Sequence, residues 1–138
     1  MKVHFFEEDK TFPKFFRRKK ARSLIQNIIE LESSKSINYI NIILCSDSYL
    51  LHINTSYLQH SYYTDIITFD YSNNVIESDI FISLDRIVEN AEKNCVTLQS
   101  ELHRIIIHGI LHLVGYKDAT KEEKKLMTQK ENYYLNLI

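Results

Sequence analysis

The sequence predicts an α+β domain in which about four strands form a mixed sheet packed with five helices. Three observations predict it: strand and helix patterns alternate in the first half, two strand patterns follow each other in the middle, and only helical patterns come after them. The chain has 138 residues, 44% of them hydrophobic, which suffices for one sizeable core. Its two glycines and one proline mark no linker. We therefore expect residues 1–138 to form a single domain.

The first half of the chain is predicted to contain two strands and two helices. Residues 3–6 have the pattern of a short strand, and apolar residues recur at helical spacing within residues 14–32. Residues 38–44 are rich in β-branched side chains, as expected of a strand buried on both faces. The Ser-Asp pair that follows can cap a helix, which we expect over residues 47–58.

The second half is predicted to contain a hairpin and three helices. Residues 65–71 and 77–83 are strand patterns separated by a turn sequence. Residues 85–95 favour a helix, and a further helix follows after a short break. Thr120 and Glu123 can form the capping box of the last helix. The side chains of this helix that we expect to close the core are Leu126, Tyr133, Tyr134 and Leu137.

Cysteine usage and hydropathy indicate a cytoplasmic protein without a membrane segment. Cys45 and Cys95 occur in separate apolar segments without CxxC spacing, so we expect two buried free thiols rather than a disulfide or a cysteine zinc site. Residues 1–6 contain no apolar stretch of signal-peptide length, and no later run approaches the roughly 20 residues that span a bilayer.

A cluster of basic residues opens the first predicted helix of a chain whose net charge is −1. Cations at a helix N-terminus are disfavoured by the helix dipole, so a bound anion would offset that cost. Phosphate groups of RNA are one candidate, and a solvated surface without a ligand is the other. The cluster consists of Lys14, Arg17, Arg18, Lys19, Lys20 and Arg22.

The stretch from Glu101 to Asp118 carries the pattern of a metal site. His108 and His112 are four residues apart in an apolar run, so on a helix they lie on one face about 6 Å apart. Gly115 can end that helix, which lets the chain turn back and bring Asp118 to the same point. Two imidazoles and a carboxylate suit one Zn²⁺ ion and leave a fourth position for water or substrate.

The rest of this predicted helix is apolar apart from one polar stripe. Glu101, Arg104, His108 and His112 fall within a stripe roughly 80° wide, and apolar residues occupy most of the remaining surface. A buried helix with such a stripe needs partners for the histidine nitrogens, and a metal ion can supply them. The alternative is that the two histidines are ordinary core or surface residues.

The residue after the first histidine separates two kinds of metal chemistry. In the zinc peptidase pattern HExxH this residue is a glutamate that acts as general base, whereas here it is Gly109. Peptide hydrolysis by that mechanism is therefore disfavoured. A metal-activated water can still cleave a phosphodiester bond without a protein base.

Residues 108–118, HGILHLVGYKD, together with the upstream TDIITFDY and SDIFIS, resemble the motifs of the YbeY family of bacterial endoribonucleases and ribosomal RNA maturation factors. The resemblance covers roughly residues 38–118. It implies a metal-dependent, single-strand-specific endoribonuclease that acts in 16S rRNA 3′-end maturation and ribosome quality control. The implied partners are single-stranded RNA, including rRNA, and the small ribosomal subunit. The resemblance also implies that Thr64 and Asp65 would orient either the loop or the metal ligands through hydrogen bonds.

Three positions differ from the usual pattern of that family. Ser78 replaces the glycine before Asp79. Asp118 is found where most members have a third histidine, and Leu58 where many have an arginine in the active site. The resemblance implies that His60 or Arg104 would supply the missing positive charge beside the catalytic ligands His108, His112 and Asp118.

Two other functions are compatible with the same residues. One is a ribosome-assembly binding factor with a structural metal and little or no nuclease activity. The other is a zinc hydrolase that acts on some other small substrate, for which RNA affinity would be weak and nearly independent of salt.

Overall fold

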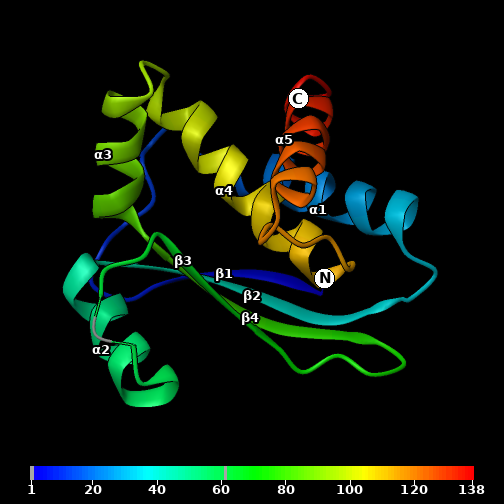
Figure 1. The fold of residues 1–138 in the computed structure, drawn as a ribbon, viewed down its shortest axis with the longest axis horizontal. Coiled ribbons are helices and arrows are strands. Elements are labelled where there is room, and N and C mark those ends of the chain that lie inside the picture. The colour runs from blue at the N-terminus through cyan, green and yellow to red at the C-terminus, as the bar shows by residue number, and fades with distance from the viewer. Residues whose placement is uncertain (1, 61) are drawn as a thin grey trace.

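The computed structural model describes residues 2–60 and 62–138 and contains five helices and four strands in that part of the chain. The α+β class predicted from the sequence is confirmed (Figure 1). The strands are β1 (Val3–Glu7), β2 (Ile37–Cys45), β3 (Ile66–Asp70) and β4 (Ile76–Ser83). The helices are α1 (Arg18–Glu32), α2 (Asp47–Leu58), α3 (Leu84–Lys93), α4 (Leu98–Leu113) and α5 (Lys121–Leu135).

The four strands form one mixed sheet in the order β1-β2-β4-β3. β1, β2 and β4 are parallel, and β3 pairs antiparallel with β4 as the predicted hairpin requires. Because side chains alternate along a strand, the register places Ile66 and its partner Ile82 on the same face of the sheet. Thr68 and Asp70, at alternate positions of β3, point to that face as well.

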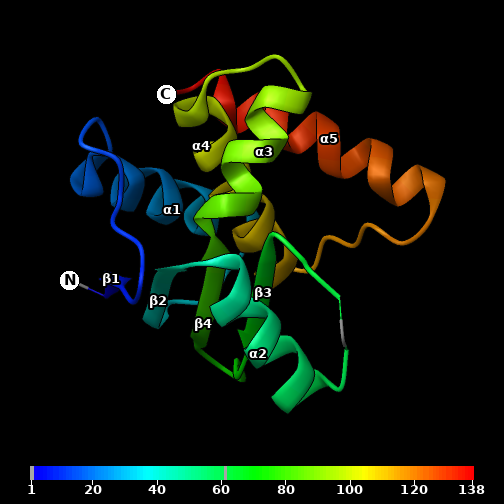
Figure 2. The ribbon, with the colours of Figure 1, turned by 90° about the vertical axis from the view of Figure 1, so that its left-hand side faces the viewer.

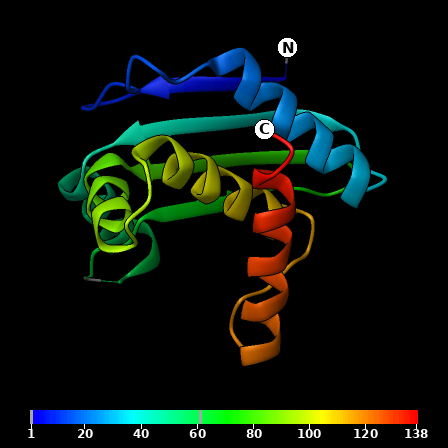
Figure 3. The same ribbon diagram turned by 90° about the horizontal axis from the view of Figure 1, so that it is seen from above.

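Helices cover the two faces of the sheet unequally. Figures 1 and 2 show α1, α3, α4 and α5 above the sheet and α2 alone below it, and Figure 3 shows α4 running across the covered face. The main core lies between the sheet and α1, α4 and α5. A second, smaller cluster lies between α2 and the sheet and consists of Cys45, Leu50, Ile53 and Ile67. None of the helices in the described ranges combines the length and apolarity needed to cross a bilayer.

Helix α1 begins at Arg18, four residues later than predicted. The preceding segment is occupied by aromatic packing: Phe12 and Phe16 stack with their ring centroids 4.5 Å apart, and Phe16 is buried. The predicted basic cluster is therefore divided between this segment and the first turns of α1.

Two predictions about burial are wrong. Cys95 is exposed, because it follows the end of α3 in a turn with φ 56°, which directs it away from the core. On α5 only Tyr134 is buried among the four side chains expected to close the core. That helix contacts the core through a narrow stripe at helical spacing, formed by Met127, Glu131 and Tyr134. Leu126 and Tyr133 lie outside the stripe, and Leu137 follows the end of the helix.

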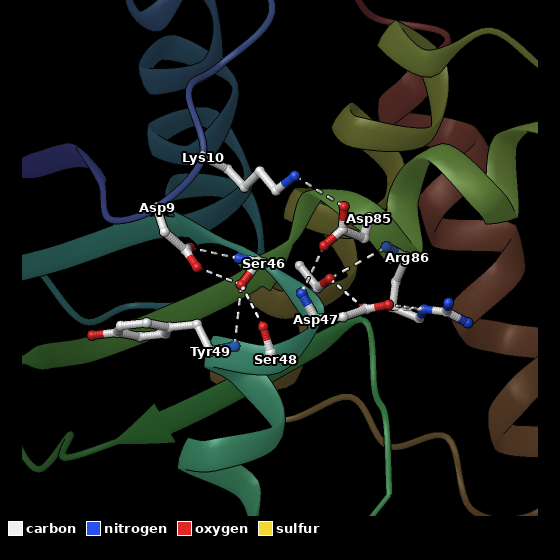
Figure 4. A network of polar contacts seen from close by, with 9 residues as sticks. Asp9, Lys10, Ser46, Asp47, Ser48, Tyr49, Asp85 and Arg86 are labelled. Carbon is white, nitrogen blue, oxygen red and sulfur yellow. Dashed lines mark hydrogen bonds and ion pairs between the residues drawn. The ribbon is translucent and has the colours of Figure 1, made fainter.

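A polar network joins the N-termini of α2 and α3 at the carboxyl ends of the parallel strands (Figure 4). The Asp47 carboxylate accepts from Ser83 Oγ at 2.6 Å and from Arg86 Nε at 3.0 Å. The Asp85 carboxylate, in the first turn of α3, accepts a hydrogen bond from the backbone N–H of Asp47, the first residue of α2, at 2.9 Å. It also forms an ion pair with Lys10 at 3.2 Å. Each helix therefore supplies the other with an N-terminal carboxylate, the charge that the helix dipole favours.

This network also contacts the segment that leads to β3. The Arg86 guanidinium lies over the Tyr63 ring, 5.7 Å from its centroid. In open sheets with parallel strands, ligands commonly bind at the carboxyl ends of the strands. Here side chains of the network bond to one another at that edge, and the pocket with the predicted metal ligands lies between α4 and β3.

Candidate metal centre

Helix α4 forms where the sequence predicts it and embeds its apolar residues in the core. Thr97 caps it by accepting the Ser100 N–H at 3.1 Å. His108 and His112 lie on the polar stripe and are half-buried. The buried apolar residues of this helix are Leu102, Ile105, Ile106, Ile107, Ile110 and Leu111.

Gly115 ends α4 in the manner predicted. Its φ is 106°, its N–H bonds to the His112 carbonyl at 3.1 Å, and the Tyr116 N–H bonds to the Leu111 carbonyl at 3.0 Å. These two bonds form a Schellman motif, which satisfies the last carbonyls of the helix and reverses the chain. The reversal returns Asp118 to the end of the helix that carries His112.

His108, His112 and Asp118 direct one ligand atom each to a common point. The Nε2 atoms of the two histidines are 3.1 Å apart, and Asp118 Oδ2 lies 3.2 Å from His108 Nε2 and 3.3 Å from His112 Nε2. Ligands about 2.0–2.1 Å from a tetrahedral ion are separated from one another by roughly 3.3–3.4 Å. This nearly equilateral triangle therefore fits one small cation, and the three residues could hold a metal ion.

Glu131 of α5 contacts the other nitrogen of the His108 ring. Its Oε2 lies 2.7 Å from His108 Nδ1, and its Oε1 accepts from Arg104 Nη1 at 2.8 Å. Burial disfavours the charged form of His108, but the hydrogen bond and charge of Glu131, with further negative charge from Asp118 and Asp65, raise its pKa overall. The ring is thus held between two carboxylates.

The three ligands open into a pocket of about 440 Å³ between α4 and β3. Asp65 lies in this pocket, and burial raises the pKa of its carboxyl despite the nearby His108 and two backbone N–H bonds. Apart from the histidines, every ionisable side chain that lines the pocket in the described residues is an aspartate. The complete lining is Thr64, Asp65, Ile66, Thr68, Asp70, His108, His112, Leu113 and Asp118.

Comparison with known protein families shows which family has this sequence. The model of the family described as Endoribonuclease YbeY matches residues 3–138. The chain belongs to the YbeY family. It is 47% identical to the Endoribonuclease YbeY of Cytophaga hutchinsonii over 98% of this chain and 94% of that protein. It is 42% identical to the Endoribonuclease YbeY of Parabacteroides distasonis over 100% of this chain and 96% of that protein.

Among solved structures, the chain is similar to the solution structure of a Thermotoga maritima protein. The TM-score is 0.69 with 24% sequence identity, and the match covers 97% of this chain and 87% of that one. At this identity the likeness supports the fold, an α+β domain with a four-stranded mixed sheet.

The two residues that the YbeY resemblance suggested as sources of positive charge lie outside the described lining of the metal pocket. Arg104 bonds to Glu131 and, through Nη2, to Asn132 Oδ1 at 2.8 Å. His60 is exposed in the segment between α2 and β3 and stacks on Tyr62, with ring centroids 5.2 Å apart. Leu58, at the position of the usual YbeY arginine, is the last residue of α2 and is 39% exposed.

The six basic residues have different surroundings. Arg22 donates from Nε to the Val3 carbonyl at 2.9 Å, and Arg18 lies 3.5 Å from Glu7 and over the Phe12 ring. The other four are exposed, and no carboxylate of the described residues lies within ion-pair distance of them. These four are Lys14, Arg17, Lys19 and Lys20.

Sequence reasoning missed three residues near the ligands. Thr68 and Asp70 line the pocket because β3 alternates toward α4, and the same alternation in the sequence could have indicated them. Glu131 was missed because nothing in the sequence distinguishes it from the other acids of a charged helix. Only the packing of α5 on α4 shows that it is buried and faces His108.

Proposed function

We propose that this protein is a metal-dependent endoribonuclease that cleaves single-stranded RNA and acts on rRNA, in 16S 3′-end maturation and ribosome quality control. The observation that carries the proposal is the triangle of His108 Nε2, His112 Nε2 and Asp118 Oδ2, with sides of 3.1, 3.2 and 3.3 Å. Membership of the YbeY family supports RNA as the substrate class, because the curated relatives carry the name Endoribonuclease YbeY.

Each residue of the pocket has a distinct part in this proposal. His108, His112 and Asp118 would hold one Zn²⁺ ion, whose ligand preferences their two nitrogens and one oxygen match. When bound, the ion supplies positive charge for the phosphoryl oxygens and lowers the pKa of a coordinated water to about 7. Thr68 places a hydroxyl group in the same pocket, where it can donate a hydrogen bond to a phosphodiester, whereas the Thr64 hydroxyl donates to the Ile66 carbonyl at 3.3 Å.

The basic residues would bind RNA away from the reacting phosphodiester. Lys14, Arg17, Lys19 and Lys20 are exposed and unpaired with carboxylates of the described chain, and the metal pocket is lined by other residues. We propose that these four residues make most of the phosphate contacts that we expect from the six basic residues between Lys14 and Arg22. Arg18 and Arg22 are partly committed to Glu7 and Val3. Contacts to phosphate of this kind are independent of RNA sequence.

A cleavage assay with matched histidine variants tests the nuclease proposal. Labelled single-stranded RNA is incubated with Zn²⁺-loaded wild type, His112→Ala and His52→Ala. His52 is exposed on α2 and absent from the metal pocket, so its variant controls for loss of a helical histidine. We expect the cleavage rate to fall more than about a hundredfold in His112→Ala and to stay unchanged in His52→Ala. Removing a residue that only supports a metal ligand typically costs about 10- to 100-fold in activity, and removing the ligand itself should cost more. Equal cleavage by all three proteins would refute the proposal.

Two observations favour a second candidate function, a ribosome-assembly factor in which the metal is structural. Apart from the histidines, the ionisable lining of the pocket in the described residues is Asp65, Asp70 and Asp118, and it includes no lysine or arginine that could stabilise a reacting phosphodiester. In addition, Leu58 offers no charge at the position of the usual YbeY arginine.

The two candidates differ in what metal removal does. If the metal is structural, chelation lowers the melting temperature markedly, and binding to the small ribosomal subunit persists in His112→Ala protein that still folds. If the proposed nuclease is correct, the folded metal-free protein retains RNA affinity but loses cleavage. Affinity measured at several salt concentrations adds a third comparison, because several phosphate contacts produce a steep decrease with salt.

A further inference from the structure

The His108 ring contacts the metal pocket with one nitrogen and Glu131 with the other. Nε2 lies 3.2 Å from Asp118 Oδ2, whereas Nδ1 lies 2.7 Å from Glu131 Oε2. A neutral imidazole carries one proton, on one nitrogen or the other, and an ionised carboxylate only accepts hydrogen bonds. The Glu131 contact therefore favours the ring form with its proton on Nδ1, which leaves the lone pair of Nε2 directed at the metal point.

Glu131 is held in turn by a second residue of α4. It is 7% exposed, and its Oε1 accepts from Arg104 Nη1 at 2.8 Å. Arg104 lies one helical turn before His108, and its Nη2 bonds to Asn132 Oδ1, next to Glu131 on α5. Two donors four residues apart on α4 thus bond to the two oxygens of one α5 carboxylate. The packing of α5 on α4 determines where the His108 ring points.

The arrangement is specific to one of the two histidines. Within the described ranges, Nδ1 of His112 bonds to no carboxylate, and its side chain is more exposed than that of His108, 30% against 20%. The Arg104 charge also offsets that of Glu131. His108 therefore gains a hydrogen-bond acceptor while the net charge beside the cation stays unchanged. Added negative charge there would weaken the attraction of the cation for a phosphoryl oxygen.

We propose that Glu131 is a positioning residue that keeps the proton of His108 on Nδ1 and so prepares Nε2 to bind the metal, and that Arg104 is the residue that holds Glu131. This assigns Arg104 a role through Glu131 and not at the reacting phosphodiester. The inference rests on the metal centre of the proposed function and is independent of whether RNA is cleaved there.

The first measurement needs no variant. Long-range ¹⁵N NMR of the histidine rings in metal-free wild-type protein, at a pH above the raised pKa of His108, shows which nitrogen carries the proton. We expect the Nδ1–H form for His108. A predominant Nε2–H form would overturn the proposal, whatever the variants show.

The second measurement compares Glu131→Gln with Glu122→Gln, an exposed acid on the same helix whose loss changes the net charge equally. Zn²⁺ affinity is determined by competition with a chromophoric chelator. For Glu131→Gln we expect a roughly 10- to 100-fold loss of affinity, together with the appearance of the Nε2–H form of His108. For Glu122→Gln we expect affinity within about twofold of wild type, since no contact to a ligand is lost.

Arg104→Lys provides a third variant should Glu131→Gln fold poorly. The lysine keeps a positive charge beside Glu131. It lacks the forked guanidinium with which Arg104 bonds to Glu131 and Asn132 at the same time. We expect a smaller loss of Zn²⁺ affinity with the same shift toward Nε2–H. Folded variants with wild-type affinity and an unchanged His108 tautomer would refute the positioning role. Absence of RNA cleavage by wild type would refute only the proposed function.

Discussion

Gly109 of α4 lies against Ile66 of β3 so closely that a Cβ atom at position 109 would come within 2.9 Å of Ile66 Cδ1. Two atoms of Ile80 would lie 3.6 Å from it. The missing side chain lets α4 approach the sheet and brings His108 and His112 beside β3, where the pocket forms. The residue that occupies the general-base position of HExxH therefore has a packing role here.

Substitutions of Gly109 should differ sharply in their effect on stability. Gly109→Ala gains about 1 kcal/mol of helix propensity, and the atom that it meets is the end of a flexible side chain, so we expect a net change within about 1 kcal/mol. Gly109→Glu buries a carboxylate against Ile66 and Ile80 and should cost more than about 3 kcal/mol. Denaturant unfolding measures both. Gln99→Glu, at an exposed site of α4, is the control and should be nearly neutral.

Gly115→Ala should destabilise the protein by about 1–2 kcal/mol, since φ 106° is a conformation that residues with a Cβ rarely adopt. No atom lies within 4 Å of the added Cβ, so the cost comes from the backbone alone. We also expect weaker Zn²⁺ binding, because the turn places Asp118. Unfolding curves and chelator competition check the two effects. Unchanged stability would contradict the strained-turn explanation.

Acid should weaken the fold through His103. This side chain is 5% exposed, and burial together with the Lys20 charge lowers its pKa. A histidine with a lowered folded-state pKa stabilises the protein above its unfolded pKa of about 6.5, and this contribution is lost as the pH falls toward the folded value. We expect His103→Phe to show a smaller loss of unfolding free energy than wild type over that range. Parallel pH profiles of the two proteins would count against this assignment.

The two cysteines should differ in reactivity toward a thiol reagent. Cys45 is fully buried, and burial with the charges of Asp9 and Glu8 raises its pKa to about 12, whereas Cys95 is exposed. A disulfide reagent should therefore modify one thiol in the native protein and two after denaturation. Cys95→Ser should abolish the native reaction and Cys45→Ser should leave it intact. Rapid modification of native Cys95→Ser protein would show that Cys45 is accessible.

The elements of the fold follow largely from local patterns in the sequence. The periodicity of α4, the Thr120–Glu123 capping box and the β3–β4 hairpin are determined within a few residues, and all are found in the structure. Burial was harder to predict. Leu126 and Tyr133 are apolar residues on a helix, yet they lie outside the stripe of α5 that meets α4, and no local pattern shows where that stripe lies.

The sequence by itself determined the candidate ligands. His108 and His112 lie one turn apart on any helix, and Gly115 allows the reversal that returns Asp118, because these are short-range consequences of backbone geometry. The tertiary structure alone decided which residues support the ligands. Glu131 is 23 residues from His108 in the chain, and its 2.7 Å contact with Nδ1 exists only because α5 packs across α4. Contacts between distant segments depend on the packing of the whole core, which a local pattern does not contain.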